Sequence, residues 1–160
     1  MTAHIRRHSA DIPVPQLLGM LSLCRKVYAL TSFIEGRSLD ELWPDLSSTD
    51  KFSTRDQLDA ILENLRPLPL PSKYLGGGNP PQCIDYRMWK GKSPESMESE
   101  AHMEPYVEFV RPMLRENHCI VVTHGDRHPH DEERGGIRIT GLIGWEVGGV
   151  YPEYWESVKF

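Results

Sequence analysis

The sequence has few cysteines and no long apolar run. Its three cysteines, Cys24, Cys83 and Cys119, follow no pairing spacing, which favours free thiols in a reducing compartment, each acting as a small apolar filler. No stretch approaches the length of a membrane span, and Arg6 and Arg7 are not followed by the apolar run of a secretory signal. We therefore expect a cytoplasmic protein with no membrane partner.

An excess of basic residues is also missing. The chain has 18 Lys and Arg against 23 Asp and Glu, which gives a net charge of −5. This balance argues against a general surface for nucleic acid or anionic membranes. At 160 residues the chain has the size of one domain, with enough apolar residues for a single core.

The most informative stretch is T-H-G-D-R-H-P-H-D at residues 123–131. It follows the apolar residues 120–122, which are typical of a buried strand, and it precedes a second β pattern at residues 137–140. Three histidines and two aspartates therefore lie in a loop between apolar strands. Loops held by a rigid scaffold are where reactive side chains are commonly presented.

Three blocks in order carry a family resemblance. They are H-G-D-R-H-P-H-D at 124–131, I-T-G-L-I-G-W-E at 139–146 and Y-P-E-Y-W-E at 151–156. They resemble the catalytic loop H-G-D-L-H-P-R-N, the metal motif I-I-D-W-E and the G-x-Y-P-x-Y-W-E segment of the aminoglycoside phosphotransferase family, in its fungal-type variant. These proteins are protein-kinase-like small-molecule kinases. The resemblance runs, with gaps, from about residue 12 to the C-terminus.

The resemblance implies a chemistry of ATP, Mg²⁺ and a small-molecule hydroxyl compound. Asp126 matches the base that orients the substrate hydroxyl, and Asp131 stands at a metal-binding Asn, where a carboxylate still offers oxygen to magnesium. Gly144 stands where the family has its second metal ligand, an Asp, so that ligand is lost. Glu146 is a carboxylate in the family too and is at best a displaced substitute.

The resemblance also implies an architecture. We expect an α+β, protein-kinase-like fold, with residues 1–35 forming a remnant of the small lobe and the hinge. The strands of this remnant are residues 17–20 and 27–31, with Lys26 at their turn. Residues 36–160 are expected to form a mainly helical large lobe with a β hairpin at the catalytic loop. In the hinge, main-chain groups near Ser32 and Ile34 would meet adenine.

Parts of the family's small lobe have no counterpart in this sequence. We find no phosphate-covering loop, no lysine for the α- and β-phosphates and no helix glutamate to hold it, and Lys26 lies on the wrong side of the I-P-V-P segment at 12–15. Loss of one preorganised charge-stabilising group typically costs on the order of 10²–10³ in rate. We therefore expect a truncated chain with impaired catalysis. Incomplete strands also expose edges and apolar surface, which predicts self-association or marginal stability.

Local patterns predict three helices. Ser38 and Glu41 form a capping box for a short helix that stops at Pro44. Leu58, Ile61, Leu62 and Leu65 recur at helical spacing, which predicts a core-facing amphipathic helix ended by the prolines at 67, 69 and 71. A third apolar stripe runs through residues 106–114. The glycine run at 76–78 lacks the context of a phosphate loop and is expected to be an ordinary loop.

Three functional hypotheses follow. The first is a kinase-like remnant, or pseudokinase, without phosphoryl transfer. The second is an active small-molecule kinase with Asp126 as base and with Asp131 and Glu146 on magnesium. The third is a metal-dependent hydrolase, because imidazoles and carboxylates are usual metal ligands; its ligands would come from His124, His128, His130, Asp126 and Asp131.

Overall fold

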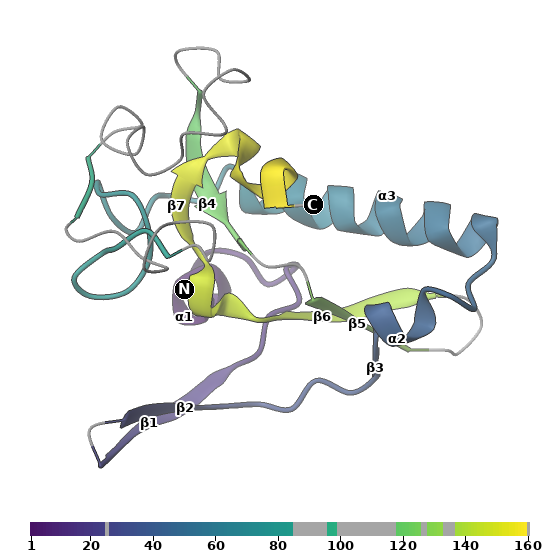
Figure 1. Cartoon of the computed structure of the whole chain (residues 1–160), viewed down its shortest axis with the longest axis horizontal. Coiled ribbons are helices and arrows are strands. Elements are labelled where there is room, and N and C mark those ends of the chain that lie inside the picture. The colour runs from purple at the N-terminus through teal and green to yellow at the C-terminus, as the bar shows by residue number, and fades with distance from the viewer. Residues whose placement is uncertain (25, 85–95, 99–117, 126–127, 133–136, 160) are drawn as a thin grey trace. The chain divides into compact units, whose positions relative to one another are not determined.

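The protein has a mixed α+β architecture with short antiparallel sheets, which confirms the predicted class. The computed structural model describes residues 1–24, 26–84, 96–98, 118–125, 128–132 and 137–159 (Figure 1). Contacts divide the chain into two compact units. Unit 1 comprises Met1 with residues 65–126 and 144–160, and unit 2 comprises residues 2–64 and 127–143. The division into lobes at residue 35 stays a prediction.

Unit 2 holds most of the regular elements. Its helices and strands are α1 (Thr2–His8), β1 (Leu17–Leu23), β2 (Lys26–Thr31), β3 (Arg37–Ser38), α2 (Leu39–Leu42), α3 (Ser48–Leu65, whose last residue falls in unit 1), β5 (His128–Glu132) and β6 (Arg138–Ile143). β3, β5 and β6 form a three-stranded antiparallel sheet, and β5 contains the second half of the motif at 123–131, so residues 128–131 lie in a strand where a loop was expected.

β1 and β2 form the hairpin predicted for residues 17–31. The strands pair antiparallel from Leu17↔Thr31 to Leu23↔Lys26, so a two-residue turn joins them and Lys26 opens the second strand (Figure 1). Apolar and β-branched residues favour this extended conformation. Cys24 in the turn has φ 50°, the left-handed conformation that such tight turns require.

The caps of the two consecutive helices differ from expectation. Ser38 is the N-cap of α2, but its hydroxyl makes no capping bond to the helix backbone and contacts the Asp40 carboxylate instead. The predicted capping box at Ser38 is therefore wrong. A cap that the sequence analysis did not identify lies before α3, where Ser47 Oγ accepts from the Asp50 N–H at 3.2 Å and donates to its carboxylate at 2.6 Å.

The predicted amphipathic helix is confirmed within α3. Leu62 and Leu65 are buried and Leu58 and Ile61 are partly buried, on the same face as the fully buried Thr54. The helix begins at Ser48, nearly three turns before the apolar stripe. It ends at Leu65, ahead of the proline-rich segment as predicted.

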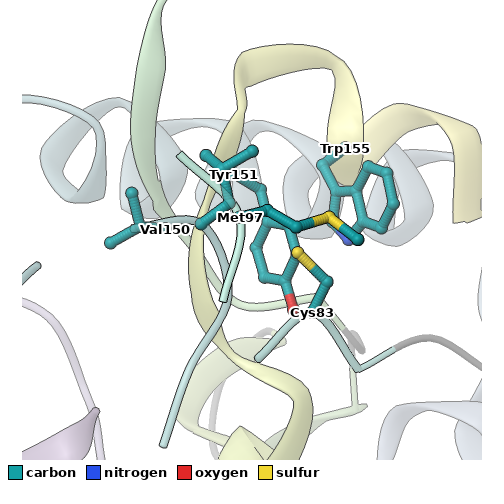
Figure 2. Packing of buried hydrophobic residues seen from close by; sticks show 6 residues of the cluster. Cys83, Met97, Val150, Tyr151 and Trp155 are labelled. Carbon is teal, nitrogen blue, oxygen red and sulfur yellow. The ribbon is translucent and has the colours of Figure 1, made fainter. Parts of the chain in front are cut away.

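Unit 1 packs around a small aromatic core. β4 (Ile120–Thr123) pairs antiparallel with β7 (Gly149–Pro152), and the short 3-10 helices η3 (Trp145–Val147) and η4 (Glu153–Lys159) flank β7 in the chain. The Tyr151 and Trp155 rings stack at 4.9 Å. Around them cluster buried apolar residues (Figure 2), namely Leu75, Cys83, Met97 and Val150.

The surroundings of the glycine run and of the three cysteines test the local predictions made for them. Gly76 exchanges both backbone hydrogen bonds with Val150, at 2.7 and 3.0 Å, so this segment is a loop docked on β7 as expected. Cys83 is the apolar filler predicted, whereas Cys24 and Cys119 are exposed, and for them that prediction is wrong. The stripe at 106–114 lies outside the described residues. None of the described helices is long and apolar enough to span a membrane.

Candidate functional site

The start of the predicted catalytic loop is held by a buried carboxylate. β4 delivers the chain to His124 and Gly125, and Glu156 from η4 accepts hydrogen bonds from both backbone N–H groups through the same oxygen, Oε1. The Gly125 N···Oε1 distance is 3.1 Å. Glu156 is only 4% exposed. Charge-assisted bonds of this kind are about twice as strong as neutral ones, so they fix the path of the loop.

Two further contacts complete this anchor, one between aromatic rings and one through the backbone. The fully buried His124 ring meets Trp145 edge to face, with centroids 4.3 Å apart. Gly125 has φ 78°, and a Cβ there would lie 2.9 Å from the Val147 carbonyl oxygen. A glycine is therefore needed for the turn to pack on η3. The His124 ring therefore packs the start of the loop against η3.

The side chains of the two predicted carboxylates lie outside the described part of the structure. Asp126 lies outside the described residues, immediately after the anchored Gly125. The backbone of Asp131 lies in β5, opposite Arg37 of β3 and Ile139 of β6, and its side chain lies outside the described part. Their roles as base and magnesium ligand stay predictions.

Gly144, where the family resemblance predicts a metal ligand, lies in a backbone turn. Gly144 has φ 83° and ψ 36°, a left-handed conformation, and it precedes the first residue of η3. Glu146, the proposed substitute, is exposed on η3. Within the described ranges, no group of three His, Cys, Asp or Glu side chains could hold a metal ion. The described residues thus do not make a magnesium or zinc site.

The predicted hinge offers one main-chain position for a ligand. Ser32 is engaged, because its N–H donates to the Gln16 carbonyl at 2.8 Å and its hydroxyl accepts from the Gln16 N–H at 2.9 Å. The main-chain groups of Ile34, in contrast, form no hydrogen bond with the described parts of the chain.

Unit 2 also fixes the Ile34 side chain against β6. A Cβ on Gly141 would meet Ile34 Cγ2 at 2.6 Å, so only glycine leaves room for this side chain. The next residue is fixed as well, because the Glu35 carbonyl accepts from Thr140 Oγ1 at 2.8 Å. The extended stretch after β2 is thus held in place, whereas the main-chain N–H and C=O of Ile34 form no hydrogen bond with the described residues.

Sequence reasoning identified the loop but missed the residue that holds it. Glu156 entered only as the last letter of the Y-P-E-Y-W-E block, and its partners lie 31 and 32 residues away. The one available signal was an acidic residue directly after a tryptophan in an apolar context. Scans of protein-family models, curated proteins and solved structures return no match to this chain.

Proposed function

We propose that this chain is a remnant of a protein-kinase-like small-molecule phosphotransferase, which binds adenine nucleotide weakly and does not transfer phosphate. The observation that carries the proposal is the pair of hydrogen bonds that the His124 and Gly125 N–H groups donate to the Glu156 carboxylate. It holds the loop directly before Asp126, where a kinase-like enzyme must position its base. The motif resemblance supplies the reaction class.

The proposed absence of phosphoryl transfer rests on Gly144. Phosphoryl transfer depends on metal ions that neutralise charge on the β- and γ-phosphates. Glycine supplies no side-chain oxygen, and the exposed Glu146 lies two residues further on, after the left-handed turn. A magnesium ligand is therefore missing at the position where the family resemblance requires one.

Nucleotide binding rests on Ile34. Its main-chain groups take no hydrogen bond from the described residues, and its side chain is packed on Gly141. A held backbone with an unused donor and acceptor is the kind of edge that recognises a purine base. Because the contact uses the main chain, it does not depend on the identity of the side chain.

The test is calorimetric titration with ATP, with and without Mg²⁺, using GTP as the control ligand. We expect weak ATP binding that magnesium does not tighten. Gly144→Asp is expected to introduce magnesium dependence, and Gly144→Asn is its matched control, because both residues tolerate the left-handed conformation and only Asp carries the charge. Strong magnesium dependence in the native chain would favour an active kinase. Absence of binding in every condition would refute the proposal.

The main-chain contact has its own pair of variants. Ile34→Pro removes the N–H as well as the side chain, whereas Ile34→Ala shortens the side chain and keeps the N–H. We expect loss of ATP binding in the first and retention in the second. Equal loss in both variants would assign the effect to packing against Gly141 and would argue against recognition by the backbone.

A further inference from the structure

The β1–β2 hairpin exposes most of the large apolar side chains that face solvent. Nine of the twelve large hydrophobic residues exposed in the described chain lie between residues 17 and 33, and they are 36–85% exposed. They are Leu17, Leu18, Met20, Leu21, Leu23, Val27, Tyr28, Leu30 and Phe33. Nearly every residue of both strands is exposed, so this surface lies on both faces of the hairpin.

With its two faces counted together, the apolar surface of the hairpin is as large as the largest patch on a typical monomer. A large aliphatic side chain contributes roughly 100 Å² of apolar surface, since its full burial is worth about 1.5–3 kcal/mol at about 25 cal/mol per Å². Nine side chains exposed by about half then leave on the order of 500 Å², near the upper end of the ~300–600 Å² patch of a typical monomer. The five of these side chains that lie on β1 are the ones that an edge contact through this strand would bring against a second copy, beside the main-chain hydrogen bonds of the pairing.

Within the described residues, the outer edge of β1 carries no charge and no proline, and its one irregularity is a register shift between Leu17 and Gly19, at the start of the strand. Among the described strands, β1 pairs only with β2. Its sequence, L-L-G-M-L-S-L, contains no charged residue and no proline, whereas β2 begins with Lys26. Natural edge strands are usually protected by lysine, proline or a bulge that turns the edge away. An uncharged strand can also pair antiparallel with its own copy, because such an interface is self-complementary.

We propose that this hairpin is a homodimerisation element, in which β1 pairs antiparallel with β1 of a second copy to form a sheet ordered β2-β1-β1-β2. Pairing satisfies the outer main-chain groups of β1 and brings apolar side chains of the two copies together on both faces. A two-stranded hairpin alone is marginally stable, and four strands remove that weakness. The proposal is independent of nucleotide binding.

A matched pair of lysine substitutions tests the edge. Met20 lies in the middle of β1 and is 68% exposed, and Val27 lies on β2 and is 63% exposed, so neither substitution disturbs a core. Sedimentation equilibrium under reducing conditions should show a concentration-dependent dimer for the native chain. We expect Met20→Lys to raise its dissociation constant at least about tenfold, or about 1.4 kcal/mol. Val27→Lys, one strand away from the interface, should leave it nearly unchanged.

Each other outcome overturns the proposal. A native chain that is monomeric at all concentrations has no such interface, and if it also floats with phosphatidylcholine vesicles, the hairpin binds lipid instead. Equal weakening by both substitutions means that the hairpin packs through a face and not through the β1 edge. A dimer that disappears with reductant is a disulfide of the exposed Cys24 or Cys119. Circular dichroism of each variant confirms that the fold is retained.

Discussion

Removal of the Glu156 carboxylate should destabilise the protein by several kcal/mol. In Glu156→Ala the buried N–H groups of His124 and Gly125 lose their acceptor. An unsatisfied buried donor costs about 1–3 kcal/mol, so two cost about 2–6 kcal/mol, and entry of water places the expected value near 3 kcal/mol. Small domains are stable by only about 5–15 kcal/mol in total, so this single change is severe.

Glu156→Gln separates the hydrogen bonds from the charge. The amide keeps a carbonyl oxygen at the position of the acceptor and loses only the charge assistance, so we expect a loss of about 1 kcal/mol. Glu146→Ala is the control for loss of an acidic residue in the same unit. Glu146 is exposed, and surface substitutions usually stay within about 0.5 kcal/mol.

Urea unfolding followed by tryptophan fluorescence measures these differences. Trp145 contacts His124, and Trp155 lies in the core beside Glu156 in the sequence, so both report on this region. The midpoints should fall in the order native, Glu156→Gln, Glu156→Ala, with unchanged slope. The reasoning fails if the alanine variant is as stable as the glutamine variant. It fails equally if both match the exposed control.

Two further predictions concern the backbone. Gly125→Ala should destabilise the protein by about 1–3 kcal/mol, because φ is 78° and the new Cβ approaches the Val147 carbonyl oxygen. Gly19→Ala is the control and should be tolerated, because a Cβ there meets nothing within 4 Å. A thermal melt of each variant compares the two. Ser47→Ala should lower the free energy of unfolding by about 1 kcal/mol through loss of the α3 cap. Ser38→Ala should change it little, because Ser38 makes no capping bond. Equal losses of stability in urea unfolding would contradict this difference.

Periodicity predicted the elements that depend on local pattern. The buried face of α3 was correctly placed because helical spacing acts over a few residues, whereas the hairpin at residues 17–31 was expected from the family resemblance and is present in the structure. The start of α3 was missed because its first two turns carry only one large apolar residue, Phe52, which is exposed. A polar helix end is set by its cap and leaves no apolar period.

Caps and anchors were predicted less well, for a physical reason. Ser38 and Ser47 are each followed three residues later by an acidic residue, and only the second forms the capping bonds. Side-chain rotamers and neighbouring contacts decide between the two, and the sequence pattern is the same. Glu156 is a stronger case, because its bonds to His124 and Gly125 join segments about thirty residues apart. No local pattern encodes such a pairing.

The loop anchor is compatible with the proposed absence of a metal ligand at Gly144. The bonds from Glu156 stabilise the fold whether or not the loop reacts, so selection for stability alone retains them. A side chain at position 144 has no such second role, because the left-handed turn is most easily adopted by the glycine that is present. A chain that lost catalysis would therefore keep its loop geometry and lose its ligands first. Introducing a carboxylate at position 144 while leaving Glu156 intact is consequently the most direct test of whether the loop can support magnesium-dependent nucleotide binding.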